Sequence, residues 1–355
     1  MSPLAPGARI GILGGGQLGR MLASSAAQLG FDVSILCPEP DCPASRVAMA
    51  HTVADYSDLA AVLAWAKSCD TVTYEFENVP VATAQHLIEN GIEVRPGAKA
   101  LEVSQDRIVE KTFLNDCAIA TAEFAEINTP EDIAEPIERF GGAAILKTRR
   151  DGYDGKGQVR LVTGDDYSEA LRALGGARSI LEAMVPFICE VSVIIARGPD
   201  GSSVCYDIPR NDHANGILRR STVPAGLDAT IEVRACEAAR KLAEALNYIG
   251  VLALEFFVLE TGDLLANEFA PRVHNSGHWT PEACATGQFE QHIRAIAGWP
   301  LGPVTRFHKA EMLNLLGDEI YAHSASSAQD GVLTLYGKRT PKPGRKMGHL
   351  VRRLR

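Results

Sequence analysis

The sequence predicts an α/β protein that begins with a parallel, doubly wound sheet. Two observations support this fold class: strand-like apolar runs alternate with helix-like segments over the first hundred residues, and a second αβ pattern starts after residue 98. The 355 residues are enough for two or three domains, each with its own core.

The first hundred residues supply the elements of the parallel sheet. We expect strands at 9–13, 32–37, 71–74 and 93–94, and helices at 17–29, 59–67 and 81–90. Pro96 and Gly97 then interrupt the alternation. Because these residues favour turns, they mark the expected end of the first domain.

The rest of the chain reads as a larger mixed unit. Residues 98–114 have a helical pattern, as do 231–246. Expected strands are 143–147, 159–162, 179–181, 190–196 paired with 203–207, and 251–259 paired with 264–268. From about residue 300 we expect shorter strands and turns that end in a basic tail.

Composition narrows the function classes. Hydrophobic residues make up 46% and charged residues 22%, as in an ordinary soluble protein, and the net charge of −9 disfavours a general nucleic-acid or anionic-membrane binder. The N-terminus has no secretory pattern, and the apolar stretch 251–259 is too short to span a bilayer. Eight scattered cysteines without a CxxC pair disfavour a disulfide framework or zinc site and favour reduced thiols in a cytoplasm.

The stretch ILGGGQLGRM places Gly14-x-Gly16-x-x-Gly19 directly after the first strand. This spacing is typical of a turn whose backbone amides bind a phosphate at a helix N-terminus. Dinucleotide sites also place an acidic residue at the end of the second strand, but here Pro38 shifts Glu39 past that position. The turn alone therefore leaves three interpretations open: a dinucleotide site, a structural turn, or a site for another phosphorylated ligand.

A stronger phosphate signal lies downstream. Lys147 ends an apolar strand, and the loop 151–158 (DGYDGKGQ) contains three glycines in six positions with a lysine between two of them. Such a loop exposes consecutive amides and a cation, as triphosphate binding requires. The alternative is a plain hairpin turn, although a short hairpin needs neither this length nor this charge.

Two carboxylates suggest a magnesium site. Glu255 interrupts an apolar strand, where a charge is costly without a partner, and Glu268 ends the strand expected to pair with it. Oxygen-rich side chains side by side on adjacent strands suit a hard cation bound to phosphates. The alternative is two independently solvated carboxylates at a sheet edge.

The chain resembles the ATP-grasp superfamily in the order and spacing of six features: Lys147, GYDGKG, Glu182 to Val185, Glu190, Glu255 and Asn267-Glu268. Further segments resemble one family within it, the N5-carboxyaminoimidazole ribonucleotide synthetases of purine biosynthesis. These segments are GGGQLGRM, YEFENVP, NDHANGILRRS and NEFAPRVHNSGHWT, together with GRKMGHL. The resemblance implies a Rossmann-like domain at 1–97, an ATP-grasp domain at 98–298 with a lid at about 118–178, and a small C-terminal β-rich segment at 299–355.

This family implies a carbon–nitrogen ligase that uses ATP and Mg²⁺ to join bicarbonate, through carboxyphosphate, to the exocyclic amine of 5-aminoimidazole ribonucleotide. It also implies a cytoplasmic homodimer with no nucleic-acid or membrane partner. The glycine turn would then be a wall of the ribonucleotide pocket and no NAD site. Such chemistry must hold the triphosphate in line with bicarbonate and keep water from a labile acyl phosphate.

The resemblance also implies roles for individual residues. ATP would contact Arg107, Lys147, Gly152, Tyr153, Asp154, Gly155, Lys156, Gly157, Gln158, Glu182, Ala183, Met184, Val185, Glu190, His213, Asn267 and Glu268. Glu255 and Glu268 would hold Mg²⁺. The ribonucleotide and bicarbonate would contact Gln17, Leu18, Glu75, Asn78, Tyr153, Asp154, Arg272, His274, Asn275, Ser276, Lys338 and Arg345. Arg272, His274 and Lys156 would act directly in catalysis.

Three other functions remain open at this point: a sibling ATP-grasp ligase such as a formate-dependent ribonucleotide transformylase, a dehydrogenase, and a non-catalytic nucleotide-binding module. A dehydrogenase predicts NAD binding and no need for Glu268, whereas a mere adenine binder needs no pair of carboxylates. Single residues have plainer interpretations too. His213 could be solvated, released phosphate could replace His274 as proton acceptor, and Lys338 and Arg345 could belong to a solvated basic surface.

Overall fold

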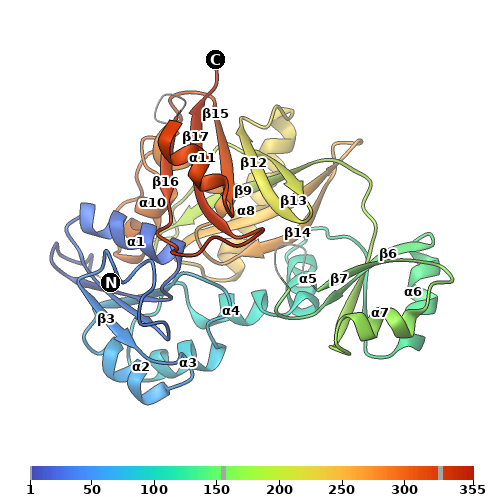
Figure 1. Cartoon of the computed structure of the whole chain (residues 1–355), viewed down its shortest axis with the longest axis horizontal. Helices are drawn as coiled ribbons and strands as arrows, with labels where there is room; N and C mark the ends of the chain where they lie inside the picture. The colour runs from blue at the N-terminus through green and yellow to red at the C-terminus, as the bar shows by residue number, and fades with distance from the viewer. Residues whose placement is uncertain (1, 153–156, 327–330) are drawn as a thin grey trace.

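The computed structural model describes residues 2–152, 157–326 and 331–355. The N-terminal sheet is parallel throughout and has the strand order β3-β2-β1-β4. Its strands are β1 (Arg9–Leu13), β2 (Asp32–Cys37), β3 (Ala50–Val53) and β4 (Thr71–Tyr74), and its helices are α1 (Gln17–Gln28), α2 (Leu59–Ala66) and α3 (Val81–Glu89). The predicted α/β class with an N-terminal parallel sheet is confirmed (Figure 1).

Two details of this sheet differ from the sequence prediction. Strand β3 was not predicted, because its residues Ala50–Val53 are at most half-buried and carry no continuous apolar run. The strand expected at 93–94 is instead a single bridge between Val94 and Val72. It comes too soon before the turn at Pro96 to form a longer ladder.

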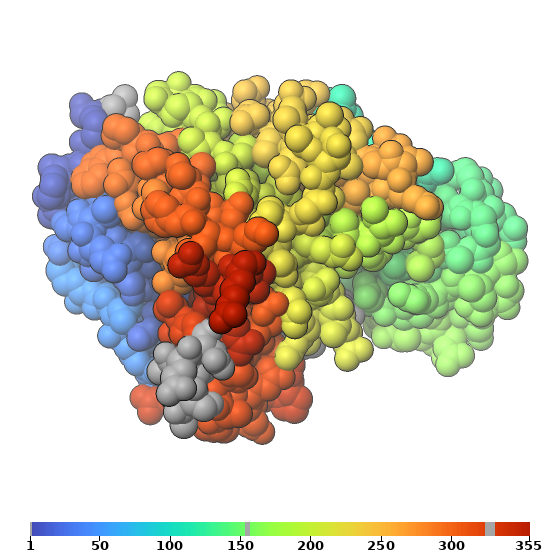
Figure 2. Space-filling view, turned by 90° about the horizontal axis from the view of Figure 1, so that it is seen from above, coloured from blue at the N-terminus to red at the C-terminus, as the bar shows by residue number. Residues whose placement is uncertain are grey.

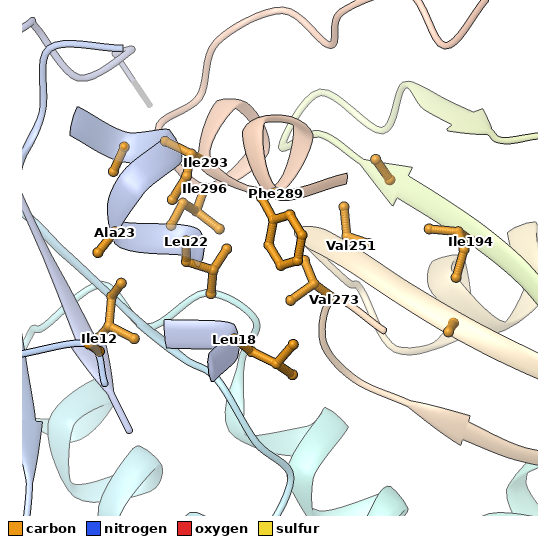
Figure 3. Packing of buried hydrophobic residues seen from close by; sticks show 14 of the residues in the cluster. Ile12, Leu18, Leu22, Ala23, Ile194, Val251, Val273, Phe289, Ile293 and Ile296 are labelled. Atoms are coloured by element: carbon orange, nitrogen blue, oxygen red, sulfur yellow. The ribbon is translucent and has the colours of Figure 1, made fainter. Parts of the chain in front are cut away.

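Helix α1 attaches the N-terminal sheet to the rest of the molecule. Its buried face includes Leu18 and Leu22, and it packs against α10 (Gln288–Ile296). Figure 3 shows Leu22 of α1 beside Ile293 and Ile296 of α10, with Phe289 and Val251 further along. Because this core is continuous, α1 and the glycine turn that precedes it are packed in a fixed position against the central sheet.

The central sheet has nine strands in the order β14-β13-β9-β11-β12-β15-β17-β16, and β10 pairs with the C-terminal end of β9, next to the part of β9 that pairs with β11. Its strands are β9 (Phe187–Arg197), β10 (Ser203–Cys205), β11 (Arg210–Ala214), β12 (Ile217–Val223), β13 (Gly250–Leu259), β14 (Leu264–Ala270), β15 (Ala310–Leu316), β16 (Val332–Leu335) and β17 (Lys346–Arg353). Helix α8 (Ala229–Ala245) packs against β9 and β13. The predicted hairpins β9–β10 and β13–β14 are present.

Strands β11 and β12 were not predicted, because polar and charged residues interrupt their apolar positions. They link the two halves of the sheet, since β12 pairs with β15 through Val223 and Ala310. The C-terminal strands therefore continue the central sheet. The short helix α11 (Glu319–Ser326) also lies in this region, where only strands and turns were expected.

A second antiparallel sheet, in the order β5-β8-β6-β7, forms a lobe at one end of the molecule (Figures 1 and 2, green). Its elements are β5 (Phe124–Ile127), the 3-10 helix η1 (Pro130–Ile133), α6 (Ala134–Arg139), β6 (Ala143–Thr148), β7 (Gln158–Val162), α7 (Tyr167–Ala173) and β8 (Ser179–Ala183). These elements enclose a small core of their own that includes Ile137 and Leu146. A separate core makes this lobe a distinct packing unit.

The segment 98–114 was expected to be one helical stretch, but it forms α4 (Ala98–Ser104) and α5 (Arg107–Asp116). The break occurs at Asp106, whose carboxylate accepts a hydrogen bond from the Ile108 amide and caps α5. The same carboxylate binds Arg149 through two hydrogen bonds of 3.0 and 2.8 Å. Asp106 thus links the end of strand β6 in the lobe to the start of α5 through its hydrogen bonds to Arg149. No helix in the described residues is long and apolar enough to cross a membrane.

Candidate active site

A cavity of about 980 Å³ is lined by residues of the N-terminal domain, of the central sheet and of the segment 149–152 that follows β6 of the lobe. Its lining includes thirteen of the residues selected from sequence: Gln17, Leu18, Glu75, Asn78, Arg107, Gly152, Glu255, Glu268, Arg272, His274, Asn275, Lys338 and Arg345. These residues come from positions 17 to 345, so the fold brings distant segments to one place. One end of the lining is acidic, with Glu255 and Glu268, and Lys338 and Arg345 supply basic groups elsewhere in it.

The glycine turn encloses a carboxylate of the chain itself. Glu75, directly after β4, accepts hydrogen bonds from the backbone amides of Gly16 and Gly19. A Cβ atom on Gly16 would lie 2.6 Å from Glu75 Oε1, so only glycine leaves room for this contact. The amides that would receive a dinucleotide phosphate are therefore already bound to an anion, which favours a structural and substrate-facing role for the turn.

Glu255 and Glu268 form the acidic end of the cavity, on the paired strands β13 and β14. Burial, and then the charge of Glu268, raise the pKa of Glu255 to about 7. Glu255 Oε1 lies 3.2 Å from His274 Nε2, and Glu268 Oε2 lies 2.8 Å from an Arg107 nitrogen. Burial opposes it, but the charge and hydrogen bond of Arg107 lower the pKa of Glu268, so the pKa values of the two carboxyl groups are shifted in opposite directions.

Asn267 precedes Glu268 in β14. Its side-chain oxygen is buried and, among the described residues, has no hydrogen-bond donor. Successive side chains of a strand point to opposite faces, and Asn267 does not belong to the described cavity lining, so the carboxylates of Glu255 and Glu268 are the oxygen ligands that this part of the cavity offers to Mg²⁺. The donor set therefore fits the expected ion.

Lys147 and Glu182 face each other across the lid strands β6 and β8, with Lys147 Nζ 2.9 Å from Glu182 Oε2. Sequence reasoning missed a third member, Lys111 of α5, which lies 3.4 Å from the same oxygen and donates to the Asn267 carbonyl at 3.1 Å. Burial raises the pKa of Glu182, but the two ammonium groups outweigh it and bring the value to about 2. Lys111 follows Arg107 by four residues, so helical periodicity could have placed both on one face.

Glu110 of α5 is the second residue that the sequence did not single out. It is buried, lines the cavity, and accepts a hydrogen bond of 2.6 Å from the Phe269 amide. Burial, followed by the charge of Glu268, raises its pKa to about 8. The carboxyl groups of Glu268, Glu110 and Glu182 thus all act on the charge of Arg107. Of the three, Glu110 is the one whose neutral form burial favours most.

A buried chain of hydrogen bonds fixes His274. Ser192 donates to Ser276 Oγ at 2.6 Å, and Ser276 Oγ lies 2.8 Å from His274 Nδ1. Since Ser276 accepts from Ser192, its own proton is available for Nδ1, which leaves the ring proton on Nε2 facing Glu255. Burial lowers the pKa of His274 well below its usual value, so the ring is neutral. Behind it, Asn211 donates to Ser192 at 3.0 Å.

Arg272 and Asn275 flank this histidine. Arg272 forms a two-point ion pair with Glu77, in which NH2 lies 3.0 Å from Oε1. Asn275 exchanges hydrogen bonds of 2.9 and 2.6 Å with Asn314 of β15. Both side chains are therefore held in one orientation before any ligand arrives.

At the basic part of the lining, Lys338 Nζ donates to the Lys346 carbonyl at 2.8 Å, and Arg345 donates to the Thr340 carbonyl at 2.9 Å. Lys346 also lines the cavity and was not selected from sequence. Arg345 is exposed, and its guanidinium makes this contact with a backbone carbonyl. Both basic side chains thus line the cavity while they are bound to backbone carbonyls of the chain.

Other selected residues take different places. His213 Nδ1 lies 3.1 Å from Glu190 Oε1, and neither belongs to the described lining. Four more residues do not belong to that lining either: Lys147, Glu182, Asn267 and Ser276. Ala183 ends β8, Met184 and Val185 follow it, and Gln158 begins β7 directly after Gly157. Tyr153, Asp154, Gly155 and Lys156 lie outside the described residues.

Comparison with known proteins identifies relatives of every part of the chain. Residues 8–105 match the ribonucleotide synthetase preATP-grasp domain, residues 112–289 the ATP-grasp domain, and residues 310–352 the phosphoribosylaminoimidazole carboxylase C-terminal domain. The chain is 51% identical to N5-carboxyaminoimidazole ribonucleotide synthase of Brucella melitensis, over 98% of this chain and 97% of the relative. The enzyme of the same name from Bacillus subtilis is 40% identical, over 98% and 91%.

Solved structures agree with these relatives. The N5-carboxyaminoimidazole synthetase of Staphylococcus aureus complexed with ADP has a TM-score of 0.95 and 36% identity, covering 100% of this chain and 95% of that one. The Aspergillus clavatus enzyme in complex with ADP and 5-aminoimidazole ribonucleotide has a TM-score of 0.92 and 32% identity, covering 98% and 94%.

Proposed function

The chain belongs to the N5-carboxyaminoimidazole ribonucleotide synthase family, and we propose that the two ends of its cavity divide the work of this ligase reaction. The enzyme is an ATP-grasp ligase of purine biosynthesis, and its relatives favour carboxylation over formyl transfer. The observation that carries the proposed division is the presence of the two carboxylates of Glu255 and Glu268 and the two cations of Lys338 and Arg345 in one cavity.

The acidic end receives the triphosphate. Arg107 and Lys147, which now pair with Glu268 and Glu182, would exchange these partners for phosphate oxygens. Glu255 and Glu268 would hold Mg²⁺, and Asn267 would contact ATP. The ion, when bound, would neutralise charge on the transferred phosphoryl group. The lid loop would close over the phosphates, and the backbone of 182–185 would contact adenine. Glu190 and His213, which bind each other, would lie near the ribose.

The ribonucleotide occupies the other end. Lys338 and Arg345 would bind its phosphate, and Gln17, Leu18, Glu75 and Asn78 would form the wall beside it. Arg272, His274 and Asn275 line the same cavity, and Ser276 contacts His274 from outside the lining. These four residues would form the site for bicarbonate and the carboxyphosphate formed from it. His274 is neutral and carries its proton on Nε2, the atom that now faces Glu255. With substrates bound, Nε2 would donate a hydrogen bond to the carboxyl group of carboxyphosphate before His274 takes part in proton transfer.

A labelled-substrate assay tests this proposal. ATP, Mg²⁺ and ¹⁴C-bicarbonate should yield labelled product and phosphate in a manner that requires 5-aminoimidazole ribonucleotide, while formate and NAD should have no effect. Glu268→Gln removes charge from the magnesium site and should lower turnover by about a hundredfold, or several kcal/mol in the transition state. The matched control is Glu260→Gln at an exposed carboxylate. Normal turnover in Glu268→Gln would remove Glu268 from the metal site.

We also propose a homodimer located in the cytoplasm, in line with the resemblance. Light scattering of the purified chain at several concentrations tests the assembly. A mass near twice 38.1 kDa is the expected result. A monomeric mass at all concentrations would contradict it.

A further inference from the structure

A cluster of soft donor groups lies in the N-terminal sheet, apart from the acidic end of the cavity. Cys37 ends β2, Cys42 lies in the following loop, and His51 lies in β3. His51 is paired with Ile35, and side chains two residues apart on a strand share a face, so His51 and Cys37 point to the same side of the sheet. Their Sγ and Nε2 atoms are 3.3 Å apart, and all three donor atoms lie within 4.8 Å of one another.

We propose that Cys37, Cys42 and His51 form a binding site for a thiophilic divalent cation of the Zn²⁺ class. Ligand bonds of about 2.3 Å to sulfur and about 2.0 Å to nitrogen, at tetrahedral angles, set donor atoms about 3.5–3.8 Å apart. The separation of 3.3 Å between Cys37 Sγ and His51 Nε2 is just below this range, and no pair of donor atoms is more than 4.8 Å apart, so small side-chain rotations suffice to close around the ion. Two thiolates and a neutral imidazole also leave a Zn²⁺ complex without net charge, which suits a buried place.

Burial and access are consistent with a metal site. Cys37 and Cys42 are 0% and 3% exposed, whereas His51 is half-buried. The sulfurs are thus shielded within the apolar core, and the histidine side leaves a path through which an ion and a fourth ligand such as water can enter. Hard cations such as Mg²⁺ prefer oxygen donors, so this site would not compete with the pair Glu255 and Glu268.

The position of the cluster suggests what the ion would do. The sulfurs pack beneath Gly15, where a Cβ atom would lie 2.7 Å from Cys42 Cβ. The loop that carries Cys42 is tied to that turn by the Ala44 amide, which donates to the Gly15 carbonyl at 3.0 Å, and to the C-terminal loop by Arg46, which donates to the Gly337 carbonyl at 2.6 Å. A bound ion would therefore brace a connection that supports one wall of the cavity. This role is independent of the proposed catalysis.

Metal titration of the full-length protein tests the site. After chelator treatment under a phosphine reductant, Cd²⁺ should produce a thiolate charge-transfer absorption that saturates at one ion per chain, and Zn²⁺ should displace it. Zn²⁺ should also raise the melting temperature, because an ion that binds only the folded state stabilises it. Cys42→Ser should abolish the absorption, and His51→Gln should weaken Zn²⁺ binding by at least about tenfold.

Cys117→Ser, at a half-buried cysteine outside the cluster, is the matched control and should leave the titration unchanged. Since Cys42→Ser could fail to fold, His51→Gln provides an independent test at a less buried position, with circular dichroism as the check on folding. The site is overturned if Cd²⁺ gives no thiolate absorption in the wild type. It is equally overturned if folded Cys42→Ser retains the absorption, or if His51→Gln binds Zn²⁺ as tightly as the wild type.

Discussion

The carboxylate of Glu75 accepts a hydrogen bond from the backbone amide of Gly16, at the turn where a dinucleotide-binding protein would hold a phosphate. Burial raises the pKa of Glu75, and the amides of Gly19 and Gly16 together with Arg272 and Lys338 act in the opposite direction. The glycine motif here therefore serves to bring a carboxylate close to the backbone. A motif read from spacing alone does not distinguish these two uses.

The first prediction concerns Glu75. Glu75→Gln keeps the shape but turns an acceptor into a donor that faces a backbone amide. A buried donor left unsatisfied costs about 1–3 kcal/mol, so we expect the free energy of unfolding in urea to fall by that amount. The KM for 5-aminoimidazole ribonucleotide should rise more than that for ATP, because Glu75 belongs to the proposed ribonucleotide site. Glu39→Gln, at an exposed carboxylate, is the control. Unchanged stability and KM would contradict the role of this contact.

The second prediction concerns Lys111, which is 1% exposed and shares Glu182 with Lys147. Lys111→Met preserves the stem but removes the charge and the donor to the Asn267 carbonyl. Breaking a buried ion pair costs about 3–5 kcal/mol, and we expect the lower end of this range in the free energy of unfolding, because Lys147 still pairs with Glu182.

The control for Lys111 is Arg139→Ala, which breaks an exposed pair with Glu135 on the lid. An exposed pair contributes about 0–1 kcal/mol. If denaturant unfolding gave the same small loss for both variants, Lys111 would not be an essential part of the charge network.

The third prediction concerns pH. The pKa of Glu110 is raised to about 8 from 4.5, so the folded protein holds this proton more tightly than the unfolded chain does. Its stabilising contribution is full below pH 4.5 and is lost as pH rises through 8. Glu110→Gln should therefore flatten the fall in unfolding free energy between pH 5 and 8, with a slope change of at most about 1.4 kcal/mol per pH unit. Glu102→Gln, at an exposed site, should keep the wild-type slope; parallel curves for wild type and Glu110→Gln would refute the prediction.

Much of the fold follows from periodicity, and the exceptions have physical reasons. Strands β1, β2 and β13 carry near-continuous apolar runs, so their existence and bounds could be predicted. Strands β11 and β12 could not be predicted, because some of their buried positions hold polar residues that bind each other. Asn211 and Ser221, for example, are both buried and are joined by a hydrogen bond of 2.8 Å. Polar residues that pair across strands look like loop residues in a single sequence.

For the site, sequence reasoning found the residues that family motifs contain, and it missed those whose role depends on burial. Glu110 and Lys111 are ordinary in the sequence RIVEK, and only their enclosure under β14 gives them perturbed charge. Likewise, Ser192 lies in an apolar strand, and nothing local shows that it reaches Ser276, 84 residues away. Such long-range contacts are set by the tertiary fold.

The last prediction separates a phosphate site from a solvated surface at Arg345. This side chain lines the cavity and now donates to the Thr340 carbonyl, a contact it can exchange for a ribonucleotide phosphate. Charge-assisted hydrogen bonds contribute about 1.5–3 kcal/mol, and each 1.4 kcal/mol is about tenfold. Arg345→Ala should therefore raise the KM for 5-aminoimidazole ribonucleotide by about ten- to a hundredfold.

Steady-state kinetics with each substrate varied in turn measures this effect. The KM for ATP should barely change, because the proposed triphosphate site lies at the acidic end. Arg353→Ala is the matched control, since Arg353 is exposed and lies outside the described lining of the main cavity. The neighbouring Arg352 would be a poor control, because its side chain is half-buried and its Nε atom is enclosed, so its replacement could affect stability. If Arg345→Ala and Arg353→Ala behave alike, Arg345 is a solvated surface charge and the ribonucleotide phosphate is held by other groups.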